Sequence, residues 1–291
     1  MKLSTKVAVG AAGLGLVAGA PLVYATSGYD RDYERGSHYE LQIVGLTEDQ
    51  RLVSFTETNP GRTRDLGKVS GLVMDGSVVG IDYRPATGDL YALGDMGGVY
   101  TIGKGATASL RSRLNVPLVG TSFGVDFNPV VDRLRIVSDT GQNLRDNVDA
   151  DNDTLTDATL TYPGVPPAPA TTATGVAGAA YTNNDADPDT ATTLYDIDST
   201  LDQVVIQSPA NAGLLAATGK LKVDAGSTVG FDIYSTVRKG TAVRIDAFAA
   251  LTSGGSDRLY EISLFNGRAR SLGKIGGKSA VTDIAIPLAQ R

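Results

Sequence analysis

The stretch Phe123-Gly124-Val125-Asp126-Phe127 is one of several near-copies of a short phrase along this chain. Closely similar phrases lie at residues 79–83 and 229–233, and weaker ones lie at 176–181 and 281–286. Counted from the glycine or its counterpart, successive copies are 44, 54, 52 and 52 residues apart. A period near 50 residues is typical of stacked or toroidal repeat folds. The repeat therefore predicts the architecture more directly than it predicts an activity.

Each repeat has the pattern of four short antiparallel strands. The phrase opens the repeat, and a turn such as residues 84–89 leads to a second strand with a Leu-x-x-hydrophobic pattern, as at residues 90–93. A third strand and a less regular fourth strand follow. Four strands in about 40–50 residues are typical of a propeller blade. We therefore predict an all-β propeller of five blades, or alternatively six, with complete repeats at 78–116, 122–166, 176–222 and 227–276.

The two ends of the repeat region complete each other. Residues 281–286 form an opening strand with nothing after it, whereas residues 41–68 form three strands with no opening strand before them. Joined, they make one further blade and leave no unpaired sheet edge at the chain ends. We expect this propeller to fill residues 40–288 as a single domain.

Glycine and aspartate are the recurring members of the phrase. Glycine lacks Cβ, so it permits the close approach that crowded innermost strands require. The aspartates either form a carboxylate ring at the channel mouth, which holds a cation or polarises a substrate, or accept hydrogen bonds from turn N–H groups in their own blades. A residue present in each blade suggests a task in each blade, so we favour structural roles. The residues concerned are Gly80, Gly124, Gly178, Gly230, Asp82, Asp126, Asp232 and Asp283.

Two acid-rich loops are candidate calcium sites. Their oxygen-bearing side chains alternate along the chain, which resembles the first part of a calcium-binding loop. Neither is an EF-hand, and the alternative is a pair of solvated acidic turns. The candidate ligands are Asp149, Asp151, Asp153 and Asp157 in the first loop, and Asn183, Asp185, Asp187 and Asp189 in the second. Calcium is the one cofactor that the sequence suggests.

The N-terminus predicts export. Two lysines precede an uncharged stretch of small and apolar residues at 7–20, and Val23-Tyr24-Ala25 fits a cleavage site. We interpret residues 1–25 as a secretory signal peptide and the polar, aperiodic residues 26–39 as a flexible leader. No other segment is apolar enough to span a bilayer, so we predict a secreted, extracellular protein without a membrane span in its mature chain.

The composition excludes several classes of function. The net charge is −6 and there is no basic stripe, so nucleic acid is not an expected partner. The chain has no cysteine, which excludes thiol catalysis, thiolate zinc sites and iron–sulfur chemistry. The one histidine, His38, lies in the predicted leader, which argues against a Ser-His-Asp triad.

Several runs of sequence resemble one bacterial family. The most specific run is Asn128-Pro129-Val130-Val131-Asp132-Arg133-Leu134-Arg135, which Gln142-Asn143-Leu144-Arg145 follows. Leu194-Tyr195-Asp196-Ile197-Asp198 adds to the pattern. Over residues 40–288 the chain resembles the family known as domain of unknown function 4394. The resemblance implies secretion and a propeller-like β fold, and it supplies no catalytic residues.

Three functions fit these features. The favoured one is a non-catalytic binding or assembly module outside the cell, whose partner is a cell-surface glycan or another secreted protein, in a homo- or hetero-assembly. The second is a calcium-assisted hydrolase or lyase with carboxylates at the channel mouth. The third is a self-assembling extracellular structural protein. The carboxylates at the channel mouth distinguish the binding module from the enzyme. Two converging, unpaired carboxylates in an open pocket favour the enzyme, whereas aspartates hydrogen-bonded within their own blades favour the binding module.

Overall fold

The computed structural model describes residues 40–183, 185–288 and 290. Two of the sequence-based predictions fall outside these residues. They concern the signal peptide at 1–25 and the leader at 26–39 with His38. Among the described residues, no helix has both the length and the apolar character needed to cross a membrane.

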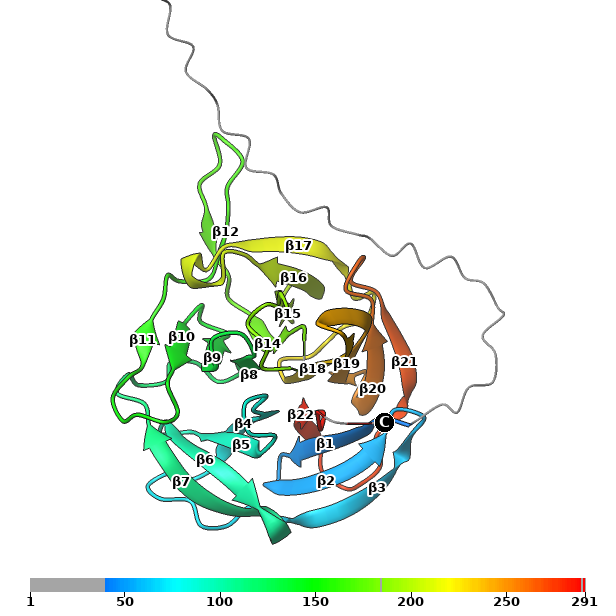
Figure 1. Ribbon diagram of the computed structural model, residues 1–291. Helices are drawn as coiled ribbons and strands as arrows, with labels where there is room; N and C mark the ends of the chain where they lie inside the picture. The colour runs from blue at the N-terminus through cyan, green and yellow to red at the C-terminus, as the bar shows by residue number, and fades with distance from the viewer. Residues whose placement is uncertain (1–39, 184, 289, 291) are drawn as a thin grey trace, which may run out of the picture. The chain divides into compact units, whose positions relative to one another are not determined.

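Four-stranded antiparallel sheets form five blades around a central axis (Figure 1). Blades 2 to 5 each use strands in chain order, with the first strand innermost. Blade 2 contains β4 (Val78–Tyr83), β5 (Leu90–Gly94), β6 (Gly98–Gly103) and β7 (Thr107–Arg113), and blade 3 contains β8 (Phe123–Asn128), β9 (Arg133–Ser138), β10 (Asn143–Asp146) and β11 (Leu155–Thr156). Blade 4 contains β14 (Val176–Tyr181), β15 (Leu194–Asp198), β16 (Gln203–Gln207) and β17 (Leu215–Lys220), and blade 5 contains β18 (Val229–Arg238), β19 (Thr241–Ser253), β20 (Ser256–Ile262) and β21 (Ala269–Lys274). The prediction of an all-β propeller with five blades, not six, is confirmed.

Blade 1 joins the two ends of the repeat region. The strand β22 (Val281–Ala285) pairs antiparallel with β1 (Gln42–Thr47), and Ile284 lies opposite Gly45. The strands β2 (Arg51–Thr56) and β3 (Asn59–Lys68) complete the sheet in the order β22-β1-β2-β3. The predicted closure of the ring is therefore present, and β22 is the innermost strand of blade 1.

One segment differs from the interpretation of its sequence. The Pro- and Ala-rich composition of residues 160–175 is typical of an extended connector within the ring. Instead, β12 (Thr161–Tyr162) and β13 (Thr171–Thr172) pair as a short hairpin that projects outward beside blade 4 (Figure 1). Prolines between the two strands cannot donate ladder hydrogen bonds, which fits their place in the hairpin tip. Within the residues that the structure describes, the helical content consists of two 3₁₀ turns, η1 (Lys104–Ala106) and η2 (Ala210–Ala212).

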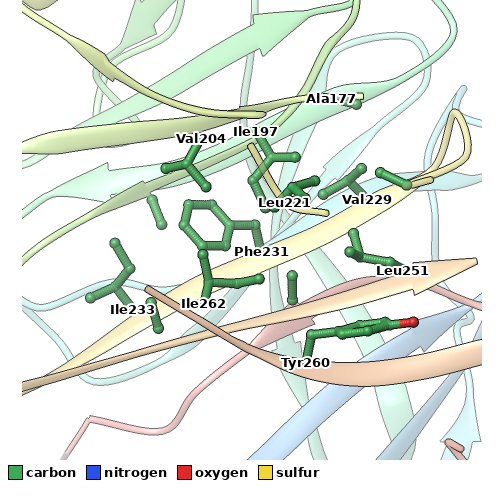
Figure 2. Close-up of a cluster of buried hydrophobic side chains, with 14 residues drawn as sticks. Ala177, Ile197, Val204, Leu221, Val229, Phe231, Ile233, Leu251, Tyr260 and Ile262 are labelled. Atoms are coloured by element: carbon green, nitrogen blue, oxygen red, sulfur yellow. The ribbon is translucent and has the colours of Figure 1, made fainter. Parts of the chain in front are cut away.

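The hydrophobic core is divided among the interfaces between blades. Successive side chains of a strand face opposite sides, so each sheet contributes to two interfaces. Between blades 4 and 5, Phe231 packs among Ile197 and Val204 of blade 4 and Ile262 of its own blade (Figure 2). Tyr234, three residues further along the same strand, belongs instead to the cluster between blades 5 and 1. Because both faces of a blade are buried against neighbouring blades, its strands carry apolar side chains on both faces.

Candidate functional site

The innermost strands β4, β8, β14, β18 and β22 surround the ring axis, and their ends form two mouths. The first residues of these strands line a cavity of about 200 Å³, which we call the wide mouth. Its lining residues are Glu48, Gln50, Val78, Val79, Thr121, Ser122, Phe123, Ala177, Thr228, Val229 and Thr282. The opposite ends enclose a cavity of about 10 Å³, which we call the narrow mouth. Its lining residues are Asp82, Tyr83, Pro85, Asp126, Phe127, Tyr181, Asn183, Asp232, Ile233, Ile286 and Leu288.

Hydroxyl and amide groups dominate the polar lining of the wide mouth. The Gln50 side chain docks on β4: its Nε2 donates to the Val78 carbonyl at 3.1 Å, and the Val78 N–H donates to Oε1 at 2.7 Å. The Ser122 hydroxyl donates to the Ser227 carbonyl at 2.9 Å. Glu48 is the one ionisable residue in the lining. The mouth is thus pre-formed and almost uncharged, with a lining that is part polar and part apolar.

The phrase aspartates converge at the narrow mouth. Asp82, Asp126 and Asp232 each place a carboxylate oxygen within 4.8 Å of the other two. All three are buried, as is Asp283 of blade 1. They meet because the repeat puts the same register position of each innermost strand at the same height on the axis. Blade 4 has Ala180 in this position, so four of the five blades supply a carboxylate.

The carboxylates join neighbouring blades. Asp82 accepts from the Tyr83 N–H at 2.7 Å with one oxygen and from the Phe127 N–H of blade 3 at 2.8 Å with the other. The sequence suggested bonds from turns within one blade. The structure instead shows Asp82 bonded to the residue that follows it and across to the next blade.

Asp232 and Asp283 repeat the arrangement. Asp232 accepts from Ile233 of its own blade and from Ile286 of blade 1, both at 2.6 Å. Asp283 accepts from Ile284 at 2.9 Å and from Ile81 of blade 2 at 2.7 Å. Through these bonds the carboxylates link blades 5, 1, 2 and 3 near the axis.

Burial raises the pKa of all four carboxyl groups above the usual range of aspartate. Burial is the largest cause for each group, and for Asp82 and Asp126 the charges of neighbouring carboxylates raise the pKa further. Among the described residues, no lysine or arginine forms an ion pair with any of the four. Without a neighbouring cation, these buried carboxyl groups therefore favour the protonated, uncharged form.

The recurring glycines explain how the innermost strands approach so closely. A Cβ built on Gly124 would lie 2.5 Å from the Ala179 nitrogen of blade 4, and one on Gly230 would lie 2.7 Å from the Asp283 Cα. A Cβ on Gly80 would meet Val125, and one on Gly178 would meet Phe231. Each glycine faces the next blade, so a side chain there would force two blades apart.

In the first acidic loop, three of the four carboxylates pair with arginines. Asp149 pairs with Arg84 and Arg111, and Asp153 pairs with Arg133 at 2.9 Å. Asp157 pairs with two arginines of blade 3, Arg135 at 2.7 Å and Arg145 at 3.1 Å. Asp151 is exposed. These carboxylates point to different partners, and calcium binding at this loop stays a prediction.

In the second acidic loop, the side chains hold the backbone turns. The Asp185 N–H donates to Asn183 Oδ1 at 3.0 Å, the Asp187 N–H to Asp185 Oδ1 at 3.1 Å, and the Asp189 N–H to Asp187 Oδ1 at 3.0 Å. Within residues 40–183, 185–288 and 290, one group of three acidic side chains converges as metal ligands would, and it is the group at the narrow mouth. Calcium at the second loop likewise stays a prediction.

Asp196 is a buried acid to which the sequence analysis assigned no role. Asp196 on β15 has no exposed surface, and neither of its carboxylate oxygens has a hydrogen-bond partner in the described structure. Burial raises its pKa well above the usual range. Its sequence does contain an indication of this burial. Asp196 lies in the middle of the second strand of its blade, and the alternation of side chains along a strand places it inside an interface between blades.

Comparison with known proteins places the fold and site in a family. The family described as domain of unknown function (DUF4394) matches residues 51–285, from the second strand of blade 1 to its last. The chain belongs to this family. The match spans the innermost strands and the carboxylates of the narrow mouth, so both are parts of a DUF4394 propeller. No curated protein shows significant similarity to the chain.

Solved structures with similar architecture are distant from this DUF4394 chain. A chain of the nidogen–laminin complex is 11% identical with a TM-score of 0.45. The alignment covers 87% of the DUF4394 chain and 86% of that chain. An auxiliary nutrient binding protein from Bacteroides thetaiotaomicron is 10% identical with a TM-score of 0.47. The alignment covers 83% of the DUF4394 chain and 63% of that protein. A putative 6-phosphogluconolactonase from Bacteroides fragilis is 12% identical with a TM-score of 0.40, with coverage of 84% of each chain. At these values the likenesses carry no argument about function.

Proposed function

We propose that this DUF4394 propeller is a secreted, non-catalytic binding module whose ligand site is the wide mouth. The observation that carries the proposal is the contrast between the two ends of the axis. The end with room for a ligand has one ionisable group, Glu48, whereas the end with clustered carboxylates has a cavity of about 10 Å³. A cavity of that size holds about one water molecule.

The narrow mouth is a poor site for hydrolysis. A paired-carboxylate mechanism needs a substrate between an acid and a base or nucleophile. Here Asp82 and Asp232 accept backbone hydrogen bonds with both oxygens, and the cavity that the described residues leave beside them is about 10 Å³. These features support a binding role over the enzymatic alternative.

The wide mouth has the chemistry of a site for a neutral polar ligand. Its volume of about 200 Å³ is below the range of about 300–1,000 Å³ that is usual for whole small-molecule ligands. One sugar unit of a longer glycan, or one side chain from a protein loop, would fit such a space. The lining hydroxyls of Thr121, Ser122, Thr228 and Thr282 and the Gln50 amide suit either. The predicted export makes a cell-surface glycan or another secreted protein the partner.

The test uses residues 26–291 and two matched variants. Thr228→Lys places a long cationic chain in the wide mouth, and Ser109→Lys makes the same change on the exposed outer strand β7. Each protein is applied to arrays of bacterial glycans and to proteins from culture supernatant. We expect one class to bind, and Thr228→Lys to weaken that binding about ten-fold or more while Ser109→Lys leaves it unchanged. Equal binding by all three proteins, or release of cleaved glycan, would overturn the proposal.

A further inference from the structure

The narrow mouth has features of a binding site for an ion. Three carboxylate oxygens from blades 2, 3 and 5 lie within 4.8 Å of one another. Oxygen ligands of Ca²⁺ lie about 2.3–2.6 Å from the ion, so two ligands on opposite sides are separated by up to about 5 Å. The oxygens of Asp82, Asp126 and Asp232 therefore already stand at separations that one such ion can bridge.

Asp126 supplies a second, separate observation. Asp82 and Asp232 each accept two backbone hydrogen bonds, one on each oxygen. Asp126 is 5% exposed, yet only the Tyr181 N–H is directed at it, and no donor reaches its second oxygen among the described residues. The N–H that would match the pattern, that of Phe127, donates to Asp82. Asp126 therefore lines the cavity with a carboxylate oxygen that accepts no hydrogen bond from the described part of the protein.

The chemistry of the ring selects a small, hard cation. Every converging ligand is a carboxylate, which suits Ca²⁺ and excludes metals that require sulfur or imidazole. A buried carboxylate without a compensating partner is costly, and no arginine or lysine pairs with these groups in the described part of the chain. The cavity of about 10 Å³ has room for an ion or a single water and for nothing larger.

We propose that Asp82, Asp126 and Asp232 bind one calcium-like divalent cation on the propeller axis, at the narrow mouth. The ion joins three blades that lie far apart in sequence and completes the contacts that the carboxylates make between blades. The site is separate from the wide mouth, so the ion stabilises the ring without touching the ligand. This role differs from the loop sites that the sequence suggested.

Terbium luminescence provides a direct test. Tb³⁺ replaces Ca²⁺ in oxygen sites and emits when a nearby aromatic ring transfers energy to it. Tyr83 and Tyr181 line the narrow mouth, and the chain has no tryptophan to obscure them. Residues 26–291 are treated with chelator, desalted and titrated with Tb³⁺ at pH 7.5, and Ca²⁺ is then added in competition. We expect a saturable signal that corresponds to one ion per chain and that Ca²⁺ displaces.

Three variants locate the ion. Asp126→Asn keeps the size of the side chain and should weaken Tb³⁺ binding about ten-fold or more. Asp151→Asn and Asp187→Asn make the same change in the two acidic loops and should leave binding within about two-fold of the parent. Excess Ca²⁺ should also raise the melting temperature of the parent by about 3 °C or more, and that of Asp126→Asn by much less.

Two outcomes would overturn the proposal. One is a folded parent, verified by circular dichroism, that gives no tyrosine-sensitised signal and no calcium-dependent rise in melting temperature. The other is a signal that a loop variant abolishes. If Asp126→Asn does not fold, the loop variants still decide: full binding in both supports the narrow mouth, and loss in either assigns the ion to that loop. Wide-mouth ligand binding is measured separately with Thr228→Lys, so failure of one proposal is distinguishable from failure of the other.

Discussion

The carboxylate of Asp82, on the innermost strand of blade 2, accepts a hydrogen bond from the Phe127 N–H of blade 3 at 2.8 Å. The two residues are 45 positions apart, close to one repeat length. Innermost strands of different blades are not paired in one sheet, so their inward N–H groups need other acceptors. The repeated aspartate supplies that acceptor without adding a strand. A side chain that recurs in four of the five blades thereby links neighbouring repeats.

Close packing between innermost strands predicts that Gly124→Ala is destabilising. The added methyl group would lie 2.5 Å from the Ala179 nitrogen, and backbone cannot move aside as a flexible side chain can. We expect the free energy of unfolding to fall by about 3 kcal/mol, the upper part of the range for overpacking. Gly103→Ala is the control, because its nearest neighbour would be an ordinary 3.7 Å away. Urea denaturation measures both; equal stability of the two variants would refute the explanation.

Ion pairs of the first acidic loop should differ in their contribution to stability. Asp157 and Arg135 have side chains only 6% and 3% exposed, whereas Asp153 and Arg133 are 40% and 32% exposed. Asp157→Ala leaves Arg135 buried without its carboxylate and should lower the free energy of unfolding by about 3 kcal/mol. Asp153→Ala should lower it by less than about 1 kcal/mol. Chemical denaturation of both proteins at low and moderate salt checks this ordering, and a reversed order would contradict it.

Asp196 predicts a pH dependence of stability. Burial raises its pKa in the folded protein, so the folded state keeps a proton that the unfolded chain releases above a pKa of about 3.9. Its contribution is therefore fully present below about pH 4 and is lost as the pH rises through the folded-state pKa. Asp196→Asn resembles the protonated form and should lose less stability between pH 5 and pH 8.

The measurement for Asp196 is the melting temperature of parent and variant across that range. The carboxylates of the narrow mouth shift stability in the same direction, so the informative quantity is the difference between the two curves. Asp89→Asn, in an exposed turn, serves as the control. Parallel curves for parent and Asp196→Asn would show that the buried carboxyl carries no such linkage.

Ring closure predicts that β22 is essential for cooperative folding. Deleting residues 279–291 removes the innermost strand of blade 1, exposes the edge of β1 and removes the Asp283 acceptor of the Ile81 N–H. We expect loss of the cooperative thermal transition and self-association through the exposed edge. Calorimetry and size-exclusion chromatography measure the two effects. A monomer that melts cooperatively near the parent temperature would contradict the role of closure.

Much of the fold was predictable because the repeat is local and regular. The spacing of Gly80, Gly124, Gly178 and Gly230 predicts the number of blades, and the unmatched strands at 41–68 and 281–286 predict their union. Both inferences use only the rule that each blade is a complete four-stranded sheet. The outward hairpin at residues 161–172 was not predictable in this way, since a Pro-rich segment has no periodicity that specifies its direction.

The candidate sites separate what sequence and tertiary structure decide. The sequence by itself determined that Asp82, Asp126 and Asp232 share one register position, and that Ala180 breaks the series. Only the tertiary structure decided that these carboxylates converge across the axis, that Asp126 has an oxygen without a donor, and that arginines from other strands hold the first acidic loop. The physical reason is that register is a property of one strand, whereas ligand distance, burial and pairing arise between segments that the ring brings together.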